Sequence, residues 1–268
     1  MDLQEIVKSG LFDLHLHTTA SDGDYSPQEV VQKAYDKELK TIAITDHDTL
    51  DGVNEAVKAG LNLGIRVIAG IELSTKYKGK TVDILGYNIK PAGELTKVLQ
   101  AMRHERETRA VQIIRKFRDI GMVISMDDVL KYSQGEVISR PHIAKAIVEK
   151  GYVNDFQTVF DMYLADGRPC AVDKMIITPE EGIRLIHNAG GLAVLAHPIV
   201  LEDHLVNELL QFPFDGIEVW HRKHGREDNE RYKAYAQQYH LIMTGGSDFH
   251  SDAHRLGEFG CDFFDGTY

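Results

Sequence analysis

Histidines and carboxylates recur where short apolar runs of this sequence end. The chain carries 13 histidines in 268 residues, and their placement is regular. His15 and His17 close the run in Asp-Leu-His-Leu-His, and Asp46 and His47 close the run in Ile-Thr-Asp-His. Residues in equivalent positions further along are Glu72, His197, Glu218, His221, Asp248 and His250. Imidazole and carboxylate groups suit Zn, Mn or Fe, so the pattern predicts a metal site.

The prediction of a metal depends on this repetition, because one His-x-His pair is weak evidence. The alternative is a set of partly buried, hydrogen-bonded histidines at strand ends. That arrangement would crowd several carboxylates together without a counter-ion, which is costly. A cysteine-based site is not expected, since Cys170 and Cys261 are far apart and in no paired spacing.

The elements that must position these residues are strands and helices in alternation. Short β-like runs alternate with amphipathic helical stretches, which is typical of βα units and a mainly parallel sheet. In parallel α/β folds the carboxyl ends of the strands form the ligand face, so the polar residues should lie together there. The seven predicted strands are residues 11–15, 41–45, 66–73, 82–87, 192–196, 216–220 and 242–246.

The alternation breaks between residues 94 and 172, where only helical signals occur. A long charged run ends at Gly121, and shorter helical runs end at Gly151 and near Gly167. We therefore predict an all-helical subdomain at 94–172, inserted between the fourth and fifth strands. The catalytic α/β domain would consist of residues 1–93 and 173–268.

Composition limits the partners. The net charge of −11 argues against binding of duplex DNA, which needs many contacts from Lys and Arg to phosphates. A small phosphorylated ligand remains compatible, because a bound divalent cation can reverse the local field. No apolar run approaches the length of a membrane span, and the first residues lack the features of a signal peptide. We expect a cytoplasmic protein without membrane contact.

Five ordered motifs resemble those of the polymerase and histidinol phosphatase (PHP) family of metal-dependent phosphoesterases. They are Asp13-Leu-His-Leu-His17, Thr45-Asp-His47, Gly70-Ile-Glu72, Ala196-His-Pro198 and Gly246-Ser-Asp-Phe-His250. The resemblance implies a distorted, TIM-like barrel of seven βα units, which agrees with the strand count. The helical insertion is similar to that of a branch containing nucleotide phosphatases and 5′-3′ exoribonucleases.

The resemblance also implies two or three divalent ions (Mn, Fe or Zn). Glu72 would bridge two of them, and Asp22 stands where the histidinol phosphatase branch has a histidine. Asn88 is aligned with a further histidine of trinuclear members, and Asp83 with a histidine of close relatives; whether Asp83 reaches the site is left open. The implied ligands are His15, His17, Asp22, His47, Glu72, His197, Asp248 and His250.

Three further residues are candidates for substrate binding and catalysis. Arg140 and His142 stand in Ser-Arg-Pro-His at the start of a predicted helix, and His221 ends Glu-Val-Trp-His. Cationic donors would complement the charge on the phosphoryl oxygens, and either histidine could protonate the leaving oxygen. The alternatives are a surface salt bridge or helix-start role for Arg140 and a solvent-exposed loop position for His221.

The leading functional hypothesis is hydrolysis, by a metal-held hydroxide, of a phosphate monoester on a small nucleotide, either a 5′-mononucleotide or a 3′,5′-bisphosphate. The second is 5′-3′ exonuclease action on short RNA, which needs the same metals but a longer groove. A histidinol phosphatase is less expected, because Asp22 and the insertion depart from that branch. A non-catalytic metal-binding scaffold is the remote alternative.

Overall fold

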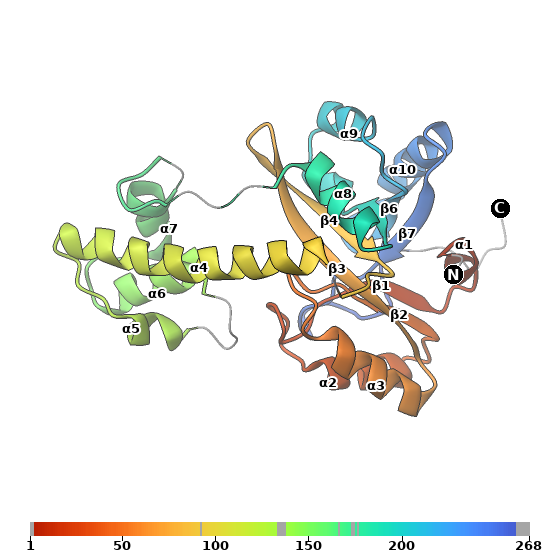
Figure 1. The fold of residues 1–268 in the computed structure, drawn as a ribbon, viewed down its shortest axis with the longest axis horizontal. Coiled ribbons are helices and arrows are strands. Elements are labelled where there is room, and N and C mark those ends of the chain that lie inside the picture. The colour runs from red at the N-terminus through yellow and green to blue at the C-terminus, as the bar shows by residue number, and fades with distance from the viewer. Residues whose placement is uncertain are drawn as a thin grey trace. The chain divides into compact units, whose positions relative to one another are not determined.

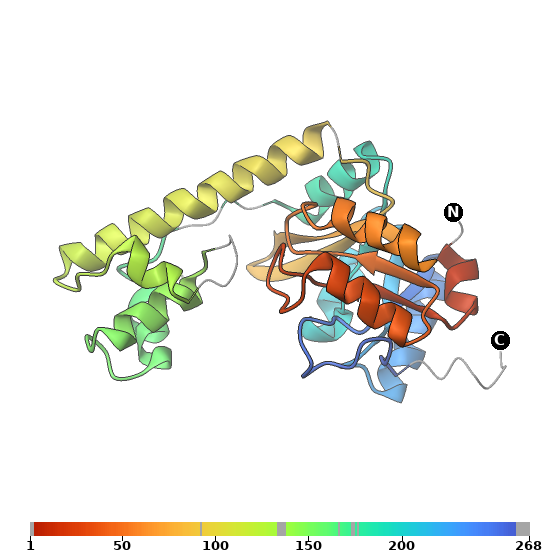
Figure 2. The ribbon, with the colours of Figure 1, turned by 90° about the horizontal axis from the view of Figure 1, so that it is seen from below.

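The computed structural model describes residues 3–91, 93–132, 138–165, 167–172, 175 and 177–260, with the side chains of 106 and 107 also left out. The chain forms two compact units, each described here by itself. The barrel unit comprises Met1–Thr96 and Ile176–Tyr268, and the helical unit comprises Lys97–Met175. Figures 1 and 2 show the fold in two views.

One seven-stranded sheet, with its strands in sequence order, forms the centre of the barrel unit. A parallel bridge between Leu16 and Phe249 brings its two edges together. The predicted α/β barrel of seven strands is confirmed. The strands are β1 (Phe12–Leu16), β2 (Thr41–Ile44), β3 (Arg66–Tyr77), β4 (Lys80–Tyr87), β5 (Leu192–Leu195), β6 (Gly216–His221) and β7 (Ile242–Gly246).

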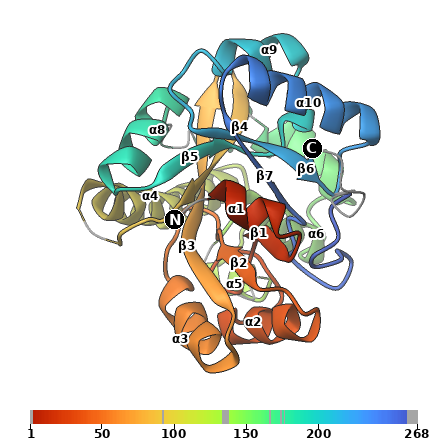
Figure 3. The ribbon, with the colours of Figure 1, turned by 90° about the vertical axis from the view of Figure 1, so that its right-hand side faces the viewer.

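Helices cover the outside of this sheet (Figure 3). Side chains cap the first turns of two of these helices: the hydroxyl of Ser26 accepts from the backbone N–H of Glu29, and that of Thr178 accepts from the backbone N–H of Glu181. The helices are α1 (Leu3–Lys8), α2 (Pro27–Asp36), α3 (Val53–Leu63), α8 (Pro179–Asn188), α9 (Asp203–Leu209) and α10 (Arg226–Gln238), with a 3₁₀ turn at Pro198–Val200.

Burial explains why the strand residues form a barrel. Every residue of β1 and of β6 is buried, so both faces of these strands are covered. On the outer side, Val30 of α2 and Ala56 of α3 belong to the same apolar cluster as Ile42 and Ile44 of β2. The inner side carries the polar residues described below. The carboxyl ends of the strands are thereby held by a packed outer layer.

The direction of β4 differs from the expectation of a βα repeat. β4 is antiparallel to both β3 and β5, whereas the other neighbouring strands are parallel. β3 continues to Tyr77, and the chain reverses at Lys78 and Gly79, whose φ angles are 47° and 83°. A hairpin therefore stands where a crossover would keep the strands parallel. The carboxyl end of β4 consequently lies at the amino ends of its neighbours.

Every element described in the helical unit is a helix, as the sequence predicts. Its core includes Ile113, Phe117, Ile143, Ile147 and Leu164. The predicted domain limits at 94 and 172 stay a prediction; the compact units meet at 96/97 and 175/176. The elements are α4 (Glu94–Asp119), α5 (Met126–Leu130), α6 (Arg140–Glu149), α7 (Phe156–Val159) and a π-helical turn at Phe160–Leu164.

None of the helices in the described part of the chain has the length and apolar character needed to cross a membrane.

Candidate metal centre

Two histidines from the end of β1 meet two carboxylates inside the barrel. His15 Nε2 and His17 Nε2 each lie 3.1 Å from Glu72 Oε2. Asp248 Oδ1 lies 3.7 Å from His15 Nε2 and 3.5 Å from His17 Nε2. His15 and His17 are two residues apart and so share one face of the strand. All four residues are buried, and their ligand atoms lie within 4.8 Å of one another.

A second group lies beside the first and opens toward solvent. Asp22 Oδ1 lies 3.7 Å from His17 Nδ1 and 3.4 Å from His250 Nε2. The rings of His17 and His250 stack with 4.0 Å between centroids, and His47 lies 4.6 Å from His17. The side chain of Asp22 is 58% exposed. These four residues form a group that could hold an ion at the rim of the barrel.

A third group surrounds the other oxygen of Glu72. His197 Nε2 lies 2.8 Å from Glu72 Oε1 and 3.9 Å from Asp83 Oδ2. Asp83, Glu72 and His47 also lie close enough to share an ion. Because β4 is antiparallel, Asp83 reaches this end of the barrel, paired with Ser74 of β3. The sequence left its role open.

Asn88, which the resemblance aligns with a histidine of trinuclear members, lies away from the histidine cluster in this structure. Tyr87 pairs with Gly70 at the opposite end of the β3–β4 pairing from Asp83, and Asn88 follows it. The physical reason is the direction of β4, which carries its carboxyl end away from the histidines.

The backbone at the strand ends turns sharply to present these side chains. His197 and Asp248 have φ angles of 24° and 51°, a region that residues other than glycine rarely adopt. Asp46, which is not placed as a ligand, accepts hydrogen bonds from the backbone and hydroxyl of Thr18 and from the hydroxyl of Ser21. Asp46 thereby fastens the loop that carries Asp22.

The buried carboxylates raise the pKa values of the two histidines of β1. Burial alone would lower the pKa of His17, but the nearby carboxylates of Asp248 and Glu72 raise it to about 9. His15 behaves in the same way, since the charges of Glu72 and Glu218 outweigh its burial and raise its pKa. The neighbouring histidines hold the pKa of Glu72 well below its usual range despite burial. Positive charge, from protons or from cations, is therefore needed to balance the buried carboxylates of the cluster.

Several of these atoms lack hydrogen-bond partners among the described residues. The approaches of His15 Nε2 and His17 Nε2 to Glu72 Oε2 do not have hydrogen-bond geometry, and all three atoms are buried and unpaired. Asp83 Oδ1 and His197 Nδ1 are also buried and unpaired. Unpaired buried polar atoms are rare in folded proteins and need an explanation. The donor set fits divalent cations bound by imidazole and carboxylate.

Three further residues complete the centre, two of them in contact with Asp248. Asp248 Oδ2 accepts from Arg222 Nη2 at 2.8 Å and lies 3.3 Å from His221 Nε2. His221 is fully buried, so the alternative of a solvent-exposed loop position is wrong. Arg222 was missed by the sequence argument, although it directly follows a predicted site residue. Glu218 contacts His15 and the backbone of His197, as developed below.

Arg140 and His142 belong to the helical unit. Arg140 begins α6 and donates from Nη1 to the carbonyl of Leu164 at 2.9 Å. His142 Nδ1 accepts from the backbone N–H of Ser139 at 3.3 Å. Arg140 and His142 thus both lie in the first turn of α6. The helix-start position considered for Arg140 is observed.

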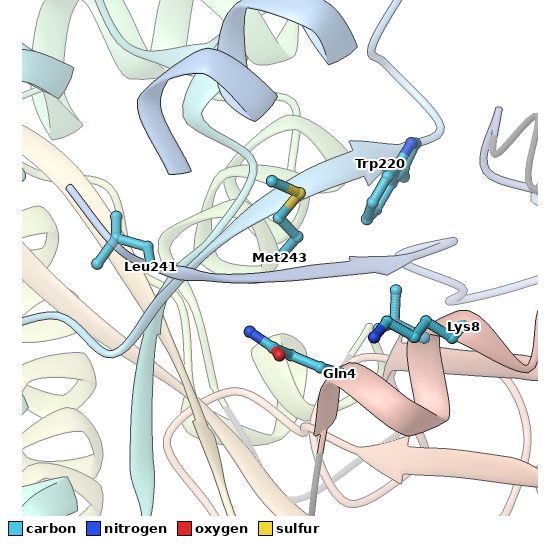
Figure 4. A pocket seen from close by; sticks show the side chains of 6 residues that line it. Gln4, Lys8, Trp220, Leu241 and Met243 are labelled. Atoms are coloured by element: carbon cyan, nitrogen blue, oxygen red, sulfur yellow. The ribbon is translucent and has the colours of Figure 1, made fainter. Parts of the chain in front are cut away.

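A cavity of about 190 Å³ lies between α1 and the strands β6 and β7 (Figure 4). It contains none of the clustered histidines or carboxylates and is separate from the metal centre. Its lining residues are Gln4, Val7, Lys8, Trp220, Leu241 and Met243.

Known proteins resemble this chain over most of its length. A model of the PHP domain matches residues 13–167. A 5′-3′ exoribonuclease of Haemophilus influenzae is 34% identical over 246 residues, covering 89% of each chain. A 3′,5′-nucleoside bisphosphate phosphatase of Chromobacterium violaceum is 34% identical over 247 residues, covering 89% of this chain and 87% of its own.

Solved structures share the fold. An amidohydrolase from Chromobacterium violaceum, with bound sulfate and no metal, has a TM-score of 0.77 at 32% identity and covers 94% of this chain and 93% of its own. A Bifidobacterium adolescentis protein assigned as a metal-dependent phosphoesterase has a TM-score of 0.76 at 30% identity, covering 94% and 92%. The predictions of the fold and of a phosphoesterase are confirmed by these matches.

Proposed function

Because the chain belongs to the PHP family, we propose that it hydrolyses a phosphate monoester on a small nucleotide, with a 3′,5′-bisphosphate or a 5′-mononucleotide as substrate. The observation that carries the proposal is the cluster of buried, unpaired imidazole and carboxylate atoms within 4.8 Å of one another. A relative that is 34% identical over 247 residues is named for 3′,5′-nucleoside bisphosphates, and one solved neighbour binds sulfate, which resembles phosphate.

The three groups suggest three ions. We propose one ion between His15, His17, Glu72 and Asp248, and a second held by Glu72, His197 and Asp83. Asp22, His47 and His250 would hold the third. Bound divalent ions would supply Lewis acidity and lower the pKa of coordinated water. Mn, Fe and Zn all suit these ligands. As the location of the protein we propose the cytoplasm.

The protein's own residues would bind and orient the phosphate. We propose that Arg140 and His142 contact the phosphoryl oxygens, since an arginine can bind a phosphate through two parallel hydrogen bonds and the positive end of a helix dipole favours an anion. The bond from Arg140 to the carbonyl of Leu164 limits the directions in which its guanidinium points. His221 is proposed as the third contact; in this structure its Nε2 faces Asp248.

The second candidate is a 5′-3′ exoribonuclease acting on short RNA. The similarity to the Haemophilus influenzae exoribonuclease is as high as that to the bisphosphate phosphatase, and it favours this alternative equally. Both reactions would use one metal centre. They differ in what leaves the centre: inorganic phosphate in the first, nucleoside monophosphates in the second.

The test is release of phosphate from 5′-mononucleotides, 3′-mononucleotides and 3′,5′-bisphosphates, with Mn²⁺ and after chelation, beside a 5′-phosphorylated RNA pentamer. The proposal expects metal-dependent phosphate release from one nucleotide class. Shortening of the pentamer from its 5′ end without phosphate release would replace it by the exoribonuclease. Activity indifferent to chelation would refute both.

Variants extend the test to the proposed contacts. Asp248→Ala should abolish turnover, and Arg140→Met should raise KM by about tenfold or more, because a charged hydrogen bond to phosphate is worth about 1.5–3 kcal/mol. Arg115→Met is the matched control, since Arg115 is exposed on α4 of the same unit. Equal KM values for Arg140→Met and Arg115→Met would remove Arg140 from the binding site.

A further inference from the structure

Glu218 is a fully buried carboxylate of β6 that contacts two of the proposed ligands. Its Oε1 lies 3.0 Å from His15 Nδ1. Its Oε2 accepts the backbone N–H of His197 at 2.7 Å. His15 belongs to β1 and His197 follows β5, so one carboxylate joins three strands of the barrel.

The contact with His15 decides which ring nitrogen is available to a cation. An ionised carboxylate only accepts hydrogen bonds, so Nδ1 of His15 carries the proton that Oε1 receives. In the neutral ring, Nε2 then keeps a free lone pair. That nitrogen points to Glu72 Oε2 at 3.1 Å and to Asp248 Oδ1 at 3.7 Å. The ring is fixed in the tautomer that a metal site requires.

The contact with His197 acts on the backbone. His197 has φ 24° and ψ 63°, and this unusual conformation needs support from its surroundings. The bond to Glu218 holds the backbone N–H while the ring Nε2 lies 2.8 Å from Glu72 Oε1. Both oxygens of Glu218 are already bonded to the protein. Glu218 also lies with His15 and His221 in a group whose ligand atoms are within 4.8 Å of one another, but because both of its oxygens already contact the protein we assign it to orienting the ligands.

We propose that Glu218 is the positioning residue that sets the tautomer of His15 and the backbone of His197 for metal binding. The inference rests on the proposed metal-dependent function and adds a residue that the ligand set does not contain. Carboxylates that fix metal-binding histidines contribute about 10- to 100-fold in metal affinity.

The test is Glu218→Gln, which keeps the shape of the side chain. If the amide nitrogen faces His15, it donates to Nδ1 and drives the proton to Nε2. If it faces His197, two N–H donors oppose each other in a buried place. Either orientation should weaken Mn²⁺ binding about 10- to 100-fold, measured on metal-stripped protein by competition with a chelating dye.

Asp215→Asn is the matched control. Asp215 Oδ2 also contacts a histidine ring and a backbone N–H, at 2.7 Å from His187 Nε2 and 2.7 Å from Ala193 N. This pair of contacts also joins β5 to the start of β6, but it is remote from the histidine cluster. A merely structural role would lower the melting temperature of both variants and leave both metal affinities unchanged, and that outcome would overturn the inference.

A second measurement does not depend on the variant folding. In Zn²⁺-loaded wild-type protein, histidine ¹H–¹⁵N spectra should show His15 with its proton on Nδ1; a proton on Nε2 would overturn the inference. Failure of the wild-type protein to bind any divalent ion would instead refute the proposed function. Wild-type binding with unchanged affinity in Glu218→Gln would leave the function intact and reject the role of Glu218.

Discussion

Replacing Glu72 by glutamine should disable the whole metal centre, because this carboxylate touches all three groups. Its Oε2 lies 3.1 Å from both His15 Nε2 and His17 Nε2 and 3.3 Å from His47 Nδ1. Its Oε1 lies 2.8 Å from His197 Nε2. Glu72→Gln keeps the size of the side chain and removes one negative charge from a fully buried place.

The magnitude follows from that charge. Two unit charges about 4 Å apart interact by about 4 kcal/mol at an effective dielectric constant of about 20. Since about 1.36 kcal/mol corresponds to a tenfold change, Mn²⁺ binding should weaken about 1000-fold. The loss is a lower bound for a divalent ion in direct contact with the carboxylate.

The assay is competition of metal-stripped protein with a chelating dye, followed by phosphate release at saturating Mn²⁺. Glu227→Gln is the control, since Glu227 is exposed on α10 of the same unit. Circular dichroism establishes that the variant is folded. A folded Glu72→Gln protein with the metal affinity and turnover of Glu227→Gln would refute the assignment of Glu72 as the shared ligand.

Three further predictions concern protons, packing and the loop after β1. Because the pKa of His17 is raised to about 9, Mn²⁺ must displace its proton below that pH. The apparent affinity for Mn²⁺ should therefore rise about tenfold per pH unit for each proton released and level off above pH 9. Calorimetry in buffers of different ionisation enthalpy measures the proton release, and a pH-independent affinity would contradict the prediction. Gly246→Ala would make the new Cβ clash with His15, so we expect the free energy of unfolding to fall by about 1–3 kcal/mol and metal binding to weaken. Urea titration and dye competition measure the two effects, and unchanged values would contradict the close packing. In Asp46→Asn the amide cannot accept all the hydrogen bonds that the loop donates to Asp46, so the free energy of unfolding should fall by about 1–3 kcal/mol and the ion near Asp22 should bind more weakly. Wild-type metal occupancy in this variant, measured by metal analysis, would show that these hydrogen bonds are not needed to hold the loop.

The sequence predicted the strands and most of the cluster because most strands are short, largely buried apolar runs with a polar residue at or just after their carboxyl end. His15, His17 and Glu72 meet as expected. Residues two apart on a strand and residues at the ends of neighbouring parallel strands are adjacent by geometry alone. Predicting that these three side chains meet therefore required only the positions of the strands in the sequence.

The direction of β4 and the partners of the outer carboxylates could not be predicted in this way. Apolar periodicity is the same for a strand running either way, so the sequence did not show that Asp83 lies near the cluster and Asn88 away from it. Gly79, between two lysines at the hairpin turn, was the available signal. The contact between Glu218 and His15 joins residues 203 positions apart, and no local pattern in the sequence records it.

The most direct test of the account is a titration of metal-stripped protein with Mn²⁺, with bound metal and phosphate release from a nucleoside 3′,5′-bisphosphate measured at every step. A metal-dependent phosphoesterase should release no phosphate when stripped of metal, and its rate should rise with occupancy until the centre is filled. Full activity before any metal is added, or no hydrolysis of any nucleotide phosphate or short RNA when the centre is full, would contradict it.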